Sequence, residues 1–477
     1  MTANGAVWHA KPARQIGPGS FRLALILMMA LPCAASAVPA LQRPDSVNVG
    51  VALAIALLAF GTVLAATIGP TRLSVWLMIL FIVRLVVALV YHQIHWSDGE
   101  QLYGMGLTAY DAYRYDDSAR QVVLHGWDLA SISVDQLGPV ASYAAVYALL
   151  GYNPVFGVIL NSLFGALTAV IIHYLAKPTT SRWVSQVAAL VVMVLPDSLL
   201  YGGQLMKEML VTVLFAAAIL GWQMFQRDGR RRGLLVFLGG LYGLLETRAV
   251  YLVILTLTVG VLVAIERRIF FKRPFAVALL GLSLAGLATA GVSNYARGVN
   301  MLSPAVWIER YNELRRSSVD AISAESADPR ASIGMRTAID PAVPATLAYV
   351  PFRIGAFYLT PPFWLWGTLP DFVPFVEISA ILSWVSLPAV LWGLWRLGRQ
   401  PRGYYLWVPF IVSTAVISVA TPFVDVRYKV ALMPLFALLA VLGFEQYRRW
   451  RRLYVPYAVV MLSMMAGYYG LKMILRG

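Results

Sequence analysis

The chain has 477 residues, of which 59% are hydrophobic and only 13% are charged, and its formal net charge is +15. Charged residues make up about 25% of a typical soluble protein, so this composition excludes a soluble globular protein and indicates a polytopic membrane protein. The positive charge lies in short runs between apolar segments, a pattern that sets membrane topology and argues against a nucleic-acid partner.

An apolar segment of about 20 residues can cross a bilayer as a helix. The sequence predicts an all-α integral membrane protein with about 13 transmembrane helices and with amphipathic helices on its outer face. The expected spans lie near residues 22–40, 48–68, 73–93, 153–176, 183–200, 208–226, 233–245, 249–265, 274–293, 375–396, 404–421, 428–446 and 453–474.

The first expected span allows a second interpretation. It ends in Ala35-Ser36-Ala37, which resembles a signal-peptidase site after a short apolar core. Cleavage there would leave the topology of the remaining chain unchanged. Three parts are therefore expected: an N-terminal two-span region at 1–70, a core at 71–446 with outer loops 94–152 and 294–374, and a C-terminal span within 447–477.

Runs of basic residues fix the expected orientation. With a cytoplasmic N-terminus, every run falls on the cytoplasmic side of a bacterial inner membrane. The runs are Lys11, Arg14 and Arg22; Lys177 and Arg182; Arg227 and 230–232; Arg267, Arg268, Lys272 and Arg273; Arg396, Arg399 and Arg402; and Arg448, Arg449, Arg451 and Arg452. Residues 233–265 must then form a pair of short helices with Arg248 at the outer tip, and 347–367 are expected to be interfacial or re-entrant.

The polar stretch 94–137 lies on the outer, periplasmic side in this topology. Its centre predicts an amphipathic helix in which Asp111, Arg114 and Tyr115 share one face, because they are three and four residues apart. Asp116 and Arg120 are predicted to be a solvated ion pair on that helix. The adjacent carboxylates Asp116 and Asp117 are the only candidates for a divalent metal site, and whether such an ion is needed stays open.

Charged side chains from several regions of the chain are expected at the outer edge of the membrane. Charges at this depth are costly, so they usually pair or line a cavity. Asp111 is the predicted catalytic base, because a carboxylate can accept a proton from an acceptor hydroxyl. The predicted substrate-binding residues are Arg114, Asp197, Lys207, Arg248, Arg353, Arg427 and Lys429. Of these, Lys207, Arg248, Arg353 and Arg427 would hold a phosphate.

Two charged positions have a structural interpretation beside the functional one. Lys207 and Glu208 are adjacent at the start of an apolar segment and fit an interfacial snorkelling pair equally well. Arg84 lies in the middle of an expected span, and Glu377 is its predicted partner. The single cysteine, Cys33, excludes an intramolecular disulfide and a cysteine-cluster metal site.

Several short segments resemble one known family. Residues 111–119, DAYRYDDSA, resemble the D-[SAE]-x-x-Y-x-x-x-A pattern of polyprenyl-phosphate-dependent GT-C glycosyltransferases, the protein O-mannosyltransferase and aminoarabinose-transferase-like group. Further similar segments are 138–151, 158–168, 194–208, 239–251, 349–364 and 425–434. Two expected spans before the one that leads into the acidic loop depart from the family pattern, as does the lack of a large soluble domain after residue 446.

The resemblance implies an inverting glycosyltransferase whose sugar donor is linked to a polyprenyl phosphate, with Asp111 as base and an acceptor glycan, lipid or protein. An O-antigen or exopolysaccharide polymerase or ligase is the first alternative, because it shares the donor and the late arginine segment. A transporter or lipid flippase is a second alternative, which predicts charges through the middle of the membrane and repeat symmetry. The expected partners are the donor, the acceptor and membrane lipids.

Overall fold

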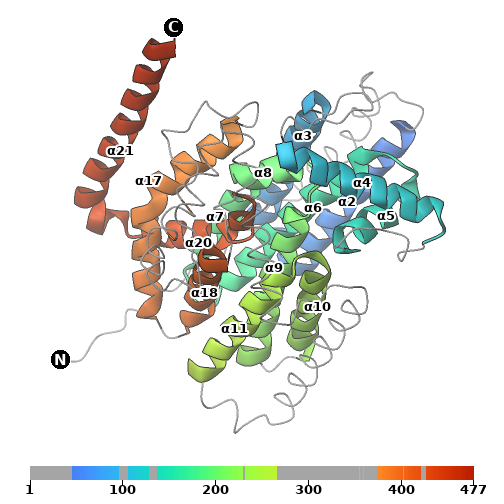
Figure 1. Ribbon diagram of the computed structural model, residues 1–477. Coiled ribbons are helices and arrows are strands. Elements are labelled where there is room, and N and C mark those ends of the chain that lie inside the picture. The colour runs from blue at the N-terminus through green and yellow to red at the C-terminus, as the bar shows by residue number, and fades with distance from the viewer. Residues whose placement is uncertain are drawn as a thin grey trace, which may run out of the picture.

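The computed structural model describes residues 46–95, 106–127, 137–228, 231–265, 354, 358, 373–400, 402–420 and 426–476. Within these ranges the secondary structure is helical, with turns between helices and no strand (Figure 1). The helices are α2 (Ser46–Thr67), α3 (Arg72–His95), α4 (Gly106–Leu124), α5 (Leu137–Leu150), α6 (Pro154–Ala176), α7 (Arg182–Met193), α8 (Pro196–Gly202), α9 (Glu208–Asp228), α10 (Arg231–Thr247), α11 (Ala249–Ile265), α17 (Val373–Gly398), α18 (Tyr404–Ala420), α19 (Val426–Val430), α20 (Met433–Phe444) and α21 (Tyr447–Arg476).

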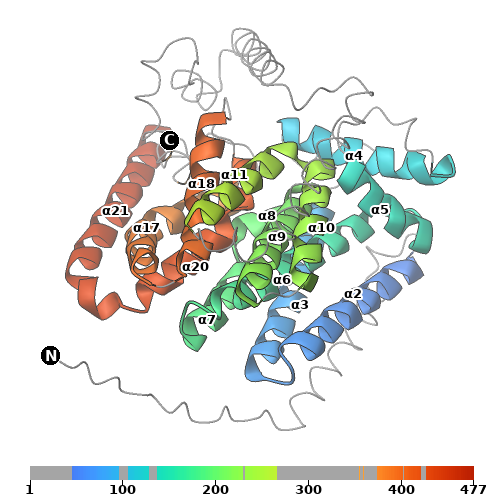
Figure 2. The same ribbon diagram turned by 90° about the horizontal axis from the view of Figure 1, so that it is seen from below.

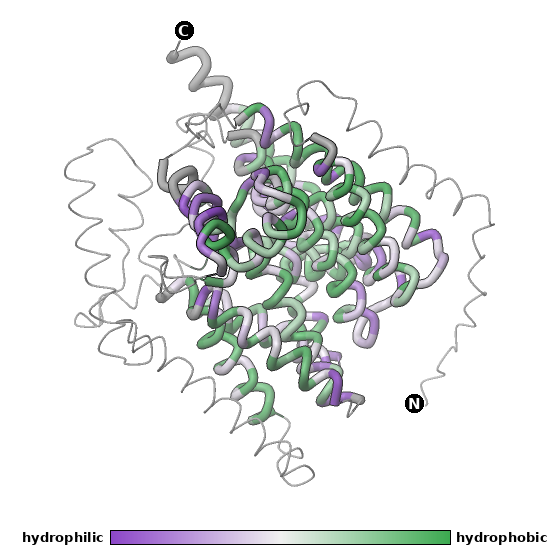
Figure 3. Tube along the Cα trace, turned by 90° about the vertical axis from the view of Figure 1, so that its right-hand side faces the viewer, coloured by the Kyte–Doolittle hydropathy of each residue, from purple (hydrophilic) through white to green (hydrophobic). Residues whose placement is uncertain are grey.

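Five helices of the described part are long and apolar enough to cross a membrane, and the bent pair α7–α8 makes a sixth if it forms one span. The five are in α2, α3, α6, α9 and α17. Most of the helical trace is hydrophobic (Figure 3). The prediction of a helical membrane protein therefore agrees with the structure. The total of 13 spans and the GT-C fold stay predictions, and the expected spans 22–40 and 274–293 lie outside the described residues.

Close helix packing builds the centre of the bundle. α9 and α10 approach through glycines: a Cβ on Gly221 would lie 2.5 Å from the backbone nitrogen of Phe237. α17 and α20 meet in the same way at Gly393, where a Cβ would lie 2.2 Å from the carbonyl oxygen of Leu439. Such small residues let membrane helices gain dispersion contacts, which replace the hydrophobic driving force that is absent in lipid.

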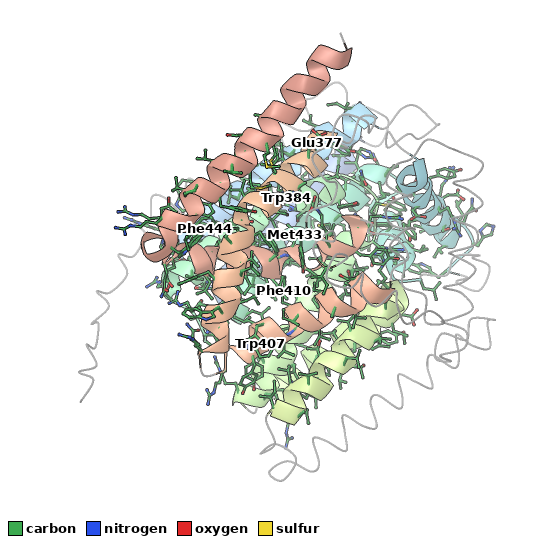
Figure 4. All side chains as sticks on the ribbon, turned by 60° about the vertical axis from the view of Figure 1, so that its left-hand side comes forward. Glu377, Trp384, Trp407, Phe410, Met433 and Phe444 are labelled. Atoms are coloured by element: carbon green, nitrogen blue, oxygen red, sulfur yellow. The ribbon has the colours of Figure 1, made fainter. Side chains whose placement is uncertain are left out.

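The C-terminal helices form the opposite side of the bundle from α4 and α5 (Figures 1 and 2). Tyr358 stacks between Phe410 of α18 and Phe436 of α20, with ring centroids 5.5 Å and 5.0 Å away. α21 packs on α17, where the Tyr457 hydroxyl donates to the Trp384 carbonyl at 2.8 Å. Figure 4 shows Phe410 and Trp384 on their helices.

The break between α7 and α8 is stabilised by a buried arginine. Pro196 starts α8, and the helix pair bends by 45°. Arg84 of α3 donates to the carbonyls of Met193 (3.3 Å) and Ser198 (2.5 Å) at the two sides of the break, and to that of Ser162 (3.1 Å). The predicted Arg84–Glu377 pair was wrong, because backbone carbonyl groups of α6, α7 and α8 and the Ser198 hydroxyl accept from the guanidinium instead.

Candidate functional site

The predicted amphipathic helix is α4, which lies beside α5 (Figure 2). Asp111 is near its start, and its Oδ2 accepts a hydrogen bond from Nη1 of Arg427 at 2.8 Å. The side chains of this ion pair are 28% and 17% exposed, so the pair lies at the rim of the structure. One turn further along α4, Tyr115 is buried.

Lys207 reaches Tyr115 from the turn between α8 and α9. Its Nζ donates to the Tyr115 hydroxyl at 2.9 Å, and the lysine is buried. Burial lowers the pKa of Lys207 to about 7, and the nearby Arg248 acts in the same direction, whereas Glu208 and Asp111 oppose the shift. Lys207 therefore changes its charge close to neutral pH.

Buried hydrogen bonds hold the turn that carries Lys207. Asn161 of α6 donates to the carbonyls of Gln204 (2.6 Å) and Met206 (3.1 Å). The Tyr143 hydroxyl of α5 donates to the same Met206 carbonyl at 3.0 Å. An irregular turn needs such partners when water is absent, and they fix the direction in which Lys207 points.

Arg248 enters the cluster from the turn between α10 and α11. Its guanidinium lies 4.2 Å from the ring centre of Tyr428, and its Nη1 lies 3.5 Å from Oε1 of Glu208. Glu208 is the first residue of α9 and is buried, so the positive end of the helix also favours its charge. Among the residues that the structure describes, no hydrogen-bond donor reaches either oxygen of Glu208.

Three consecutive residues of α19 contact three different helices and the α10–α11 turn. Arg427 binds Asp111 of α4, and the Tyr428 ring lies under Arg248. The Tyr428 carbonyl accepts from the Tyr251 hydroxyl of α11 at 2.7 Å. Lys429 lies 3.8 Å from Oδ2 of Asp197 on α8. This short helix therefore connects the cluster at the rim to the interior.

The Lys429–Asp197 pair is fully buried, with 0% and 1% of the side chains exposed. The Ser379 hydroxyl of α17 donates to Asp197 Oδ2 at 2.6 Å. A pair without exposure has no direct access to a substrate, so its geometry favours a structural role over the predicted substrate-binding role.

Asp116 is not the solvated residue that its spacing from Arg120 predicts. It is buried, and its two carboxylate oxygens accept from the hydroxyls of Tyr147 (2.6 Å) and Tyr152 (2.7 Å). Burial raises the pKa of Asp116, and the two tyrosine hydrogen bonds oppose this shift. The prediction was wrong because side chains of α5 and of the turn after it cover this face of α4. Arg120 lies 4.9 Å from the ring centre of Tyr152.

The structure thus brings four predicted site residues into one cluster: Asp111, Lys207, Arg248 and Arg427. Glu208 and Tyr115 belong to it too, and neither was among the predicted site residues, although Glu208 adjoins Lys207 and Tyr115 shares a face with Asp111. Arg114 is half-buried on α4. Arg353 lies outside the described residues. Within the described part, no three His, Cys, Asp or Glu side chains gather as metal ligands, and Asp116 is engaged by tyrosines.

No family model matches the sequence, and no curated protein is significantly similar to it. Three basic side chains and two carboxylates meet at a partly exposed rim. The cluster therefore carries one net positive charge when Lys207 is protonated. Such a cluster can hold an anionic group and present a carboxylate to a second molecule.

Proposed function

We propose that this chain is a GT-C-type glycosyltransferase of a bacterial inner membrane, which moves a sugar from a polyprenyl-phosphate donor to an acceptor at the outer face. One observation carries the proposal: Asp111, Lys207, Arg248 and Arg427 come from four distant segments and meet in one cluster. The acceptor is a glycan, a lipid or a protein. The resemblance of residues 111–119 to the family pattern supports the same conclusion.

Each member of the cluster has a role in this reaction. The acceptor hydroxyl attacks the anomeric carbon of the sugar while the bond between that carbon and the phosphate oxygen breaks. Asp111 accepts the hydroxyl proton, because its carboxylate lies at the exposed rim. Lys207, Arg248 and Arg427 stabilise the charge that develops on the leaving lipid phosphate. Arg353 is a further proposed phosphate contact.

The transporter hypothesis also has one supporting observation. Broken helices that meet a buried charge are typical of transport sites, and α7–α8 is bent beside the buried Asp197–Lys429 pair. The rim cluster favours the transferase, because a transporter has no need of a carboxylate and three basic groups at one edge. Binding of a lipid phosphate at this cluster distinguishes the transferase from a transporter of small solutes, and sugar transfer that depends on Asp111 distinguishes it from a lipid flippase.

Undecaprenyl phosphate should stabilise the purified protein in nanodiscs against thermal unfolding. A ligand at 100 times its dissociation constant stabilises by about 2.7 kcal/mol, which raises the melting temperature by a few degrees. Arg248→Ala should lose this shift, because it removes a buried phosphate contact. The matched control is Arg231→Ala, which removes an exposed arginine at the start of α10 and should keep the shift. A well-folded wild type without any shift would contradict the proposal.

Binding of undecaprenyl phosphate should also weaken as the pH rises from 7 to 9. The pKa of Lys207 is about 7, so deprotonation in this range removes one positive charge from the site. Lys207→Arg stays protonated and corrects for the titration of the lipid phosphate itself. Relative to this variant, the wild-type affinity should fall on the order of tenfold. Parallel affinity curves for the two proteins would show that Lys207 does not contact the phosphate.

A further inference from the structure

The proposed base is already engaged in this structure. Asp111 Oδ2 accepts from Arg427 Nη1 at 2.8 Å, and Arg427 is itself one of the proposed phosphate contacts. The arginine therefore sets the direction of the Asp111 carboxylate. The two roles of Arg427, as partner of Asp111 and as ligand of the phosphate, compete for the same guanidinium.

The backbone that carries Arg427 is firmly held, whereas its side chain lies at the rim. The Tyr251 hydroxyl binds the Tyr428 carbonyl, and Lys429 is buried against Asp197. The Arg427 side chain is 17% exposed, compared with 0% for Lys429. A rotation of the Arg427 side chain is therefore enough to separate it from Asp111, without movement of α19.

The energies favour an exchange of partners. A partly exposed ion pair with one hydrogen bond stabilises a protein by at most about 1 kcal/mol. A phosphate group accepts two parallel hydrogen bonds from a guanidinium, which is a stronger arrangement. Lys207 and Arg248 converge on the same cluster, so they would place the phosphate next to Arg427. The phosphate charge would also repel the Asp111 carboxylate.

We propose that the Asp111–Arg427 ion pair is a latch, which the phosphate of the lipid donor opens by taking Arg427. Asp111 becomes free to accept a proton only once the donor is in place, so proton transfer from the acceptor waits for the donor. This inference rests on the proposed function, and it adds a control of the base by the donor.

Chemical labelling of Asp111 tests the latch without an enzyme assay. A water-soluble carbodiimide with glycine ethyl ester converts accessible carboxylates to amides, and mass spectrometry measures the extent at each residue. In wild type, labelling of Asp111 should become several-fold faster when undecaprenyl phosphate is added. In Arg427→Gln, labelling of Asp111 should be fast with and without the lipid. The buried Asp116 is an internal reference that should stay unlabelled.

The control variant is Arg120→Gln, which removes another arginine that packs against the Tyr152 ring outside the cluster and should leave the labelling of Asp111 as in wild type. Melting temperatures of the same samples report lipid binding. Binding without faster labelling of Asp111, or slow labelling in a folded Arg427→Gln protein, would overturn the latch and leave the proposed function standing. No lipid binding in wild type would overturn both.

Discussion

Replacement of Lys429 by methionine should lower the free energy of unfolding by about 3–5 kcal/mol. Lys429 and Asp197 are fully buried 3.8 Å apart, so the substitution leaves a buried carboxylate without its counter-charge. Loss of one partner of a buried ion pair has this magnitude because the remaining ion keeps its desolvation cost. Unfolding by SDS in mixed micelles, followed by circular dichroism, measures the change.

The double variant Asp197→Leu, Lys429→Met separates the charge effect from other damage. It removes both ions from an apolar environment, so most of the lost stability should return. The hydroxyl of Ser379 loses its acceptor in both the Asp197→Leu single variant and the double variant. Lys177→Met serves as the matched control, because Lys177 is exposed and should change the free energy by less than about 1 kcal/mol. A double variant as unstable as Lys429→Met alone would show that the charges are not the cause.

The sequence was sufficient to predict four members of the rim cluster, but not Glu208 and Tyr115. Runs of arginine and lysine indicate the side of each loop, and this assignment puts Asp111, Lys207, Arg248 and Arg427 on one side. The structure brings these four together. Their contacts could not be predicted, because Asp111 and Arg427 are 316 positions apart and only helix packing brings them into contact.

The two incorrect predictions, for Asp116 and for Arg84, have the same physical cause: the true hydrogen-bond partners come from other segments of the chain. Asp116 was assigned to Arg120 from the spacing within one helix, but tyrosines outside that helix supply its hydrogen bonds. Arg84 was assigned an acid as partner because a buried charge usually needs one. The structure instead offers carbonyl groups at the break between α7 and α8, and hydropathy alone does not reveal such a break.

The short helix α19 connects the rim cluster to the buried Lys429–Asp197 pair. A buried ion pair fixes its interior side, and a weak ion pair occupies its rim. A strong anchor beside a weak contact allows one side chain to change partner while the fold stays intact. Substitutions at Lys429 should therefore change stability, whereas substitutions at Asp111 should change chemistry.

Asp111→Asn should lower sugar transfer by a factor of about 10² to 10⁴, which is the usual contribution of a general base. The amide keeps the size of the side chain, but it cannot take the proton from the hydroxyl of the acceptor molecule. Stability should change by less than about 1 kcal/mol, because the Asp111–Arg427 pair is partly exposed. The donor for this assay is a preparation of radiolabelled polyprenyl-phosphate-linked sugars from the lipid fraction of the bacterium that makes the protein. Transfer is measured as the radioactivity that moves from these lipids to acceptors in membranes of the same bacterium.

The matched control for this experiment is Asp117→Asn, the same chemical change on the same helix at a half-buried position outside the cluster. It should leave transfer unchanged. Asp111→Asn should still bind undecaprenyl phosphate, because Lys207, Arg248 and Arg427 remain. Lost transfer with retained lipid binding assigns Asp111 to the chemical step. Undiminished transfer in a normally folded Asp111→Asn protein would exclude Asp111 as the base and leave Glu208 as the carboxylate to test next, since no hydrogen-bond donor of the described residues reaches its oxygens.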